Sequence, residues 1–402
     1  MLSKIRKIGK IEISGEKLFF IALTLSLIAS FIISTTFMPY IQVKHLNWVN
    51  YLAIGILLMK IYIFDQWHLS EYVGITIILC LSFISWRKTN YNNLMVLITF
   101  ILAGKNVNFK KVIQYYFNIN FSLLLLVIIY SLIGIIRNLV FYRDGIVRMG
   151  MGIDYPTDLA AYVFYLILAY VYLHYRELHI LDYIVFILIA TVLNVVTNAR
   201  LDVIAILLII PIIMVAKYAE QSKKKLTCFF PSYYWALSLI LPFVYVLITY
   251  YYHTSNILLR MINQLLSGRL EYGNLAFHRY DFTFFGQKVT EHGWGGVKGH
   301  STYQSNPFNY FYVDSTYVRL IVIYGLILGI IIMFMVLLIS VRATLNHSYL
   351  LPAIVLLVTI SSLIDTHMLE INYNPFLIAL FANVAYTTGG FKDERKILIE
   401  SF

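Results

Sequence analysis

Long apolar stretches recur along almost the whole chain and restrict its fold more than any other feature. A helix of about 20 apolar residues can cross a bilayer, because its backbone groups bond to one another and need no water. At that length per span the chain has room for about twelve helices. They are expected at residues 18–40, 48–64, 72–86, 91–104, 117–136, 159–175, 181–197, 203–216, 228–252, 315–340, 349–366 and 375–388. With 60% hydrophobic and 13% charged residues, the composition excludes an ordinary soluble domain. The sequence therefore predicts an all-α polytopic membrane protein.

Basic residues predict how these helices are oriented, because cytoplasmic loops are rich in lysine and arginine. Both ends of the chain are basic, with Lys4, Arg6, Lys7, Lys10 and Lys17 at the start and Lys392, Arg395 and Lys396 at the end. We therefore expect both termini in the cytoplasm. Residues 1–252 would hold helices 1–9, with an outer loop at 137–158. Residues 253–314 would form a long, partly helical extracytoplasmic loop, and residues 315–402 would hold helices 10–12 and a cytoplasmic tail.

Lysine and arginine separate between the two predicted sides. The inner segments hold 14 Lys and 4 Arg, whereas the outer segments hold 4 Lys and 9 Arg. Topology alone does not require this separation, because either residue keeps a loop in the cytoplasm. Arginine differs from lysine in its planar guanidinium group, which binds phosphate or carboxylate through two parallel hydrogen bonds. The arginines indicate a bound diphosphate or other acidic group near the outer leaflet. The alternative is that they reach individually to lipid headgroups. The net charge of +11 gives no indication of a nucleic-acid partner.

The long loop contains two arginines that could bind such a group. Ser267 and Gly268 precede an expected helix at 270–280, and either residue could cap it. The free N–H groups of the helix would then favour an anion beside Arg269. Arg279 lies roughly 15 Å further along this helix and would reach another part of a long ligand. The alternative is a surface helix with ordinary basic residues.

Asp314 directly precedes the tenth predicted span. Its carboxylate could orient or deprotonate an acceptor hydroxyl, or it could simply cap the helix. Tyr317 would share its helix face. Either His292 or His300, in the glycine-rich stretch 290–300, could replace Asp314 as the base.

Two further groups lie near the predicted outer boundary. Arg200 occupies a tight bend between two spans, where it could bind a ligand or pair with Asp202. Asp365, His367 and Glu370 cluster in a later hairpin, with His367 and Glu370 spaced to meet. Ionisable residues at this depth indicate a functional site, although helix capping also explains Glu370.

The usual signatures of nucleotide and metal chemistry are missing from the sequence. It has no Walker motif, no GxGxxG, no HExxH and no Asp-rich cluster typical of magnesium-diphosphate sites. We therefore expect no cofactor and no metal, with the energy for any reaction supplied by the substrate.

Several short motifs together resemble one family. They are Asn198-Ala199-Arg200-Leu201, Ser267-Gly268-Arg269, Phe284-Phe285-Gly286, Asp314-x-x-Tyr317 and Tyr324-Gly325-Leu326. This pattern resembles the Wzy-type oligosaccharide repeat-unit polymerases of O-antigen, capsule and exopolysaccharide synthesis, relatives of the O-antigen ligases. The resemblance covers mainly the C-terminal half of the chain.

The resemblance implies a GT-C-like, metal-independent glycosyltransferase in the bacterial cytoplasmic membrane. The donor would be a glycan on undecaprenyl diphosphate, and the acceptor would be one lipid-linked repeat unit. A flippase and a chain-length regulator would be its partners. The arginines implied to stabilise the leaving diphosphate are Arg148, Arg200, Arg260, Arg269 and Arg279. Related ligases have a histidine where this sequence offers Asp314, so the resemblance leaves the base open.

Three alternatives remain at this stage. A lipid-linked oligosaccharide flippase or other transporter should show inverted repeats and interrupted helices. An O-antigen-type ligase shares the donor chemistry, so the sequence does not separate it from a polymerase. A non-catalytic scaffold in an export complex would need no set of arginines and acids.

Overall fold

The computed structural model describes residues 14–222 and 224–385, and in this part of the chain nine helices are long and apolar enough to cross a membrane. They are α2 (Gly15–Ile33), α3 (Val43–Met59) with η1 (Lys60–Phe64), α4 (Leu69–Thr89), α6 (Phe109–Leu132), α7 (Pro156–His174) with η2 (Tyr175–Glu177), α8 (Ile180–Thr197), α9 (Arg200–Ser222), α10 (Lys225–Cys228) with η3 (Pro231–Tyr233) and α11 (Tyr234–Tyr250), and α16 (Leu326–Leu345). The chain is thus a mostly helical, multi-pass membrane protein. The basic leader before residue 14 and the basic residues of the tail lie outside the described residues.

Three of the twelve expected spans take other forms. Helices α5 (Asn93–Leu102) and α17 (Leu350–Ser361) are shorter, with 10 and 12 residues, and their side chains are almost all buried. The described part of the last expected span contains only the 3-10 segment η6 (Phe376–Leu380), which follows a similar segment η5 (His367–Leu369). Nearly every residue from 364 to 380 is buried. Irregular backbone is tolerated at membrane depth where protein surrounds it.

The tenth expected span is broken by a glycine. It begins as α15 (Thr316–Arg319), continues as the π-helical η4 (Leu320–Tyr324) and turns at Gly325, with φ of 102°, before α16 starts. The segment Phe284–Gly286 packs against this turn so closely that a Cβ on Gly325 would lie 2.5 Å from the Gly286 nitrogen. Two of the sequence motifs, Phe284-Phe285-Gly286 and Tyr324-Gly325-Leu326, are therefore in direct backbone contact.

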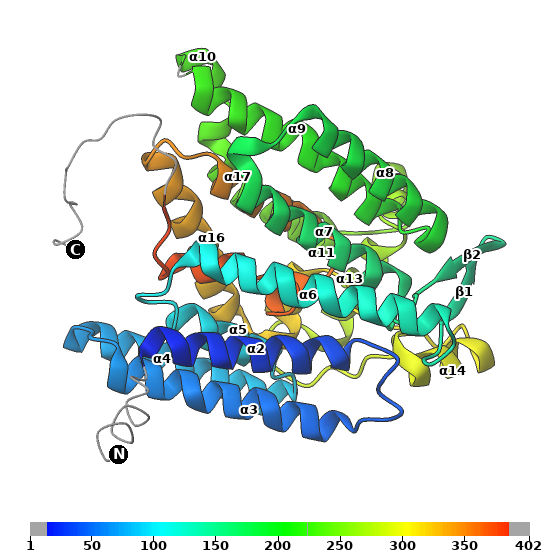
Figure 1. The fold of residues 1–402 in the computed structure, drawn as a ribbon. Coiled ribbons are helices and arrows are strands. Elements are labelled where there is room, and N and C mark those ends of the chain that lie inside the picture. The colour runs from blue at the N-terminus through cyan, green and yellow to red at the C-terminus, as the bar shows by residue number, and fades with distance from the viewer. Residues whose placement is uncertain (1–13, 223, 386–402) are drawn as a thin grey trace.

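The connections gather at two ends of the helix bundle. One end, here called the loop end, carries the hairpin β1 (Val140–Arg143) and β2 (Ile146–Met149), with α12 (Ile257–Leu265), α13 (Arg269–Tyr280) and α14 (Gly296–Ser305). Figure 1 shows α14 beside the hairpin and α10 at the opposite end. The hairpin was not foreseen in a chain expected to be all-α. His300 Nε2 lies 2.8 Å from the Val140 carbonyl and joins the segment 137–158 to the segment 253–314.

The opposite end collects the other set of connections. The ammonium group of Lys60 bonds to the Lys105 carbonyl at 2.8 Å, and that of Lys217 bonds to the Leu178 carbonyl at 2.7 Å. The Asn383 N–H donates to the Val107 carbonyl at 2.8 Å, so the described chain returns to this end.

Candidate functional site

Three arginines converge at the loop end on the bend between α8 and α9. Arg148 donates from Nε to the Thr197 carbonyl at 2.8 Å, and Arg143 donates from Nη2 to the Asn198 carbonyl at 2.5 Å. Arg200 donates from Nε to the Asn198 side-chain oxygen at 3.3 Å. The last carbonyls of a helix have no partner within it and carry partial negative charge, which explains why cations gather there. We call Arg143, Arg148 and Arg200 the arginine cluster.

The arginine cluster has no carboxylate partner among residues 14–222 and 224–385. Arg148 is only 4% exposed, yet its Nη2 and the Nε of Arg143 are buried without a hydrogen-bond partner in this part of the chain. Burial and the like charges of Arg148 and Arg200 lower the pKa of Arg143. Arg200 forms no ion pair with Asp202 in the described structure. Of the three arginines only Arg148 is buried, while Arg143 is half-buried and Arg200 is exposed. The buried positive charge of Arg148 is costly unless an anion accompanies it.

Arg269 and Asp314 form a second charged group. Arg269 Nε is 3.9 Å from Asp314 Oδ2 and also donates to the Ile364 carbonyl at 2.7 Å. Burial raises the pKa of Asp314, and the charge of Arg269 opposes that rise. The N-cap position of α15 belongs to Ser315, so the alternative that Asp314 caps this helix is wrong.

The N-terminus of α13 does not offer the anion site that the sequence suggested. Gly268 is the N-cap, with φ of 86°, in agreement with the sequence. However, the side-chain oxygen of Asn263 accepts from the N–H groups of Leu270 at 3.1 Å and Glu271 at 3.2 Å. Because these two N–H groups already have an acceptor, they are not free for an anion. Any anion bound at this end of α13 would be held by the side chain of Arg269.

Tyr155 links the arginine cluster to Asp314. Its hydroxyl lies 3.5 Å from Nη1 of Arg148, and the guanidinium carbon lies 5.5 Å from its ring centre. Burial raises the pKa of Tyr155, and the charge of Asp314 raises it further while that of Arg148 opposes the change. The two charged groups therefore belong to one polar region.

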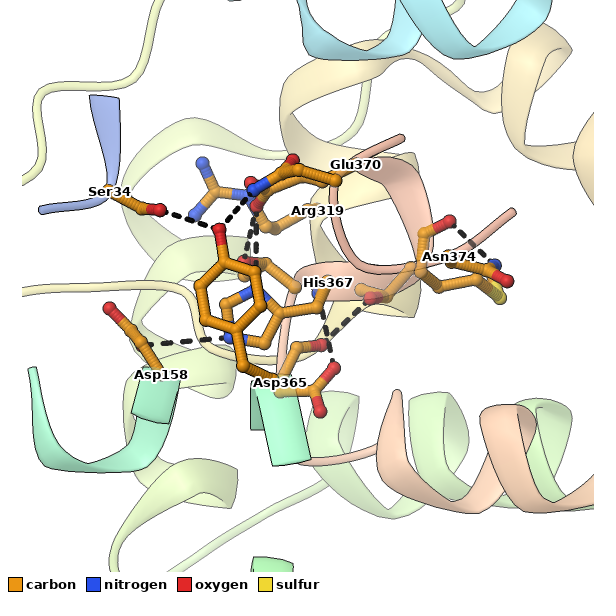
Figure 2. A network of polar contacts seen from close by, with 12 residues as sticks. Ser34, Asp158, Arg319, Asp365, His367, Glu370 and Asn374 are labelled. Carbon is orange, nitrogen blue, oxygen red and sulfur yellow. Dashed lines mark hydrogen bonds and ion pairs between the residues drawn. The ribbon is translucent and has the colours of Figure 1, made fainter. Parts of the chain in front are cut away.

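A group of acids surrounds His367 beside this region (Figure 2). The imidazole lies between Asp158 Oδ1 and Glu370 Oε1, at 3.6 Å from each, and stacks on the Tyr373 ring at 3.8 Å. The backbone N–H of His367 donates to Oδ1 of Asp365 at 3.1 Å. Burial alone would lower the pKa of His367, but Asp158, Glu370 and Asp365 raise it well above its ordinary value. These carboxylates therefore favour the protonated form of His367.

This acidic group is joined to the start of α15. Both the N–H and the hydroxyl of Thr316 donate to the Asp365 carbonyl, at 2.9 and 2.7 Å. Thr316 stands two residues after Asp314, so these hydrogen bonds connect the acidic group around His367 to the stretch of chain that carries Asp314. On the other side, Tyr162 shares hydrogen bonds of 2.6 Å with Ser34 and Asn372.

Four predicted site residues have other surroundings. Arg279 is exposed and lies over the Phe311 ring at 4.9 Å, and Arg260 is exposed on α12. Tyr317 is buried and donates to the Thr359 carbonyl at 3.1 Å. His300 bonds to Val140 and packs edge-on against Phe141 at 4.9 Å. The structure brings Arg148, Arg200, Arg269 and Asp314 into one region and leaves these four at its edge or in the core.

Arg143, Tyr155 and Asp158 were not singled out from the sequence. For Arg143 a signal existed, since Asp144-Gly145 is a typical two-residue hairpin turn. The register pairs Phe141 with Arg148 and Arg143 with Ile146, which places both arginines on one face of the hairpin. Nothing local to residues 155 and 158 marked them, because their partners come from distant segments.

The fold and site define a multi-pass membrane protein with a buried, charged region at its loop end. Among the described residues, no group of three or more His, Cys, Asp and Glu side chains is arranged to hold a metal ion. No protein-family model, curated protein or solved structure matches the chain significantly.

Proposed function

We propose that the chain is a membrane glycosyltransferase that joins oligosaccharide units carried on undecaprenyl diphosphate, like the Wzy-type polymerases that its motifs resemble. The observation that carries this proposal is the arginine cluster, in which two buried guanidinium nitrogens, Nε of Arg143 and Nη2 of Arg148, lack a hydrogen-bond partner in the described chain. Guanidinium groups match anions with several oxygens, and a diphosphate is such an anion.

The reaction transfers the glycan from one lipid carrier to another. The acceptor sugar's hydroxyl oxygen forms a bond to the donor's anomeric carbon, and the bond from that carbon to the diphosphate oxygen breaks. The electron pair stays on the lipid diphosphate, which leaves. Arginines already aimed at this growing negative charge lower the barrier.

Asp314 is the proposed acceptor of the hydroxyl proton. Its raised pKa suits a general base, and Arg269 holds it at the membrane boundary. His367 is less suited to this role because carboxylate oxygens of Asp158 and Glu370 lie 3.6 Å from its two ring nitrogens. His300 is occupied with the Val140 carbonyl, and we assign it to holding the loop.

The packing of the motifs supports the resemblance. Ser267-Gly268-Arg269 reaches Asp314 through the Arg269 contact, and the two glycine motifs meet at Gly325. Segments separate in sequence thus converge on one region. We accordingly propose the GT-C-like class, with the loop end on the outer face of the bacterial cytoplasmic membrane and both termini inside. A flippase and a chain-length regulator are the proposed partners.

A transporter of lipid-linked oligosaccharide is the second candidate. The break at Gly325 and the buried irregular segment 364–380 favour it, because interrupted helices are typical of transporters. An enzyme and a transporter differ in whether covalent bonds change.

The deciding experiment mixes purified protein with a defined undecaprenyl-diphosphate-linked repeat unit, without nucleotide or added metal. A polymerase produces a ladder of products spaced by one repeat unit. Transfer to a different added acceptor without a ladder indicates a ligase. An unchanged single band, together with movement of the lipid across vesicles, would replace the enzyme by the transporter.

A further inference from the structure

A cavity of about 1270 Å³ lies at the end of the molecule opposite the arginine cluster. It opens between the C-terminal part of α9, the segment α10–η3, the 3-10 turn η2 and the connection from α16 to α17. Drug-sized ligands occupy pockets of about 300–1000 Å³, so this cavity has room for a larger molecule. The proposed glycosyl transfer makes no use of it.

The cavity is positively charged. Arg176, Lys217 and Lys225 line it, and Glu220 is the only carboxylate among its described lining residues. Glu220 accepts a hydrogen bond from the backbone N–H of Tyr349, another lining residue, at 2.5 Å, so its carboxylate is held against the cavity wall. The ammonium group of Lys217 is fixed by backbone carbonyls, while Arg176 and Lys225 are exposed. An anion is therefore the favoured ligand.

An apolar segment, residues 226–230, flanks the rim of the cavity. Phe229 lines the cavity, and Leu226 and Phe230 belong to the same segment; the three side chains are 55%, 85% and 69% exposed. They stand at the ends of the span-length helices α9 and α11, where the membrane surface meets water. Exposed aromatic and aliphatic side chains at that level enter the headgroup region of a bilayer. A soluble anion would gain nothing from such a rim, whereas an amphiphile would.

We propose that this cavity binds the headgroup of an anionic phospholipid from the leaflet at this end of the protein. Arg176 and Lys225 contact the phosphate, Lys217 adds charge from the wall, and Phe229 packs against the start of the acyl chains. The site is distinct from the proposed diphosphate site and does not depend on the proposed function.

Cys228 lines the cavity and is half-buried, so its reactivity reports occupancy. In a Cys80→Ala variant in neutral detergent, we would measure alkylation of Cys228 by a water-soluble maleimide. The additions are phosphatidylglycerol, phosphatidylethanolamine or inorganic phosphate. A bound ligand slows the reaction by 1 + [L]/Kd, so phosphatidylglycerol at twice its Kd slows it about threefold. The other two additions should leave the rate unchanged.

Matched charge variants identify the site. Arg176→Gln with Lys225→Gln should raise the Kd for phosphatidylglycerol about 25-fold, because each basic side chain near an anionic headgroup contributes about fivefold to affinity. At the lipid concentration that protects the parent protein threefold, the double variant should then show almost no protection. The control is Lys110→Gln with Lys111→Gln, which removes the same charge from exposed positions of α6 near this end. Equal melting temperatures without lipid would show that both variants fold. Equal protection of the two variants would overturn the proposal, as would protection by phosphate alone or by phosphatidylethanolamine.

Discussion

Arg269 and Asp314 are 45 residues apart in the sequence and come together with 3.9 Å between Nε and Oδ2. Arg269 begins α13, and Asp314 stands just before Ser315, the N-cap of α15. Their side chains are 13% and 23% exposed, so the pair is shielded without being sealed. The contact fixes a carboxylate at the start of α15, in the region that holds the arginine cluster.

The first prediction concerns Asp314→Asn. If Asp314 accepts the acceptor's proton, the amide cannot replace it, and polymerisation by purified protein should fall by about a hundredfold. Since Ser315, and not Asp314, occupies the N-cap position of α15, and asparagine matches aspartate in size, the change should leave the melting temperature almost unaltered. In the wild type the rate should fall as acid protonates Asp314, whose pKa burial raises.

Asp144→Asn is the matched control, because Asp144 is exposed in the hairpin turn where asparagine is equally suited. It should leave turnover unchanged. Turnover near the wild-type level in both variants would remove the base assignment from Asp314.

The second prediction concerns Asp154 and pH. Burial, with a smaller effect from the Asp158 charge, raises the pKa of Asp154 to about 8. Between about pH 4 and that value, the folded state keeps a proton that the unfolded state has lost. Stability contributed by this group therefore falls as pH rises through this window. The wild type should lose about 2 °C or more of melting temperature between pH 6 and pH 8 relative to Asp154→Asn. Identical slopes would show that Asp154 is ionised in the folded protein.

The third prediction concerns how the loop is held. Arg319 donates to both carboxylate oxygens of Glu291, at 2.8 and 2.9 Å, and the two side chains are 5% and 4% exposed. Tyr91 donates to the same carboxylate at 2.8 Å. Glu291→Gln leaves the guanidinium buried without its counter-charge, which costs about 3 kcal/mol.

We expect Glu291→Gln to lower the melting temperature and to make residues 287–313 sensitive to protease. Glu177→Gln changes an exposed carboxylate at the opposite end and should do neither. A loop that stays protected in Glu291→Gln would mean that other contacts hold it.

The fourth prediction concerns orientation. In a Cys80→Ala, Cys228→Ala background, single cysteines at Ser255 and Ser301 occupy exposed positions of the loop end. Both should react with a membrane-impermeant thiol reagent in intact cells. Protection of both until the membrane is opened would reverse the orientation that we propose.

Helical character could be predicted from the sequence because apolar composition alone decides it. Span number could not, since α5 and α17 are as apolar as the spanning helices but are short and almost wholly buried, and the irregular segment 364–380 is buried as well. Composition does not distinguish lipid from protein as the surroundings of an apolar segment. The break at Gly325 likewise depends on close packing by Gly286, a residue far away in sequence.

Only part of the candidate site could be predicted, because contacts between segments that are distant in sequence leave no local pattern. Arg148, Arg200, Arg269 and Asp314 stood beside recognisable bends, caps and motifs, which marked them. Asp158 stood out less, because its relation to His367 arises only when α7 packs beside η5. Arg279 satisfied every sequence criterion, yet its helix turns it toward Phe311 and solvent.

The most direct test of the central claim is the rate of chain extension by Arg148→Lys. Unlike Arg269, Arg148 has no carboxylate partner in the described chain, so its proposed role is to bind the donor's diphosphate. Lysine keeps the charge but loses the paired geometry, and losing one aligned donor to a developing oxyanion costs about a hundredfold in rate.

We therefore expect initial rates, measured with saturating lipid-linked repeat unit, to fall by at least about tenfold in Arg148→Lys. Arg87→Lys, at an exposed position of α4 near the same end, should match the wild type. Equal rates in all three proteins would contradict the account and leave the arginine cluster as a helix-capping feature.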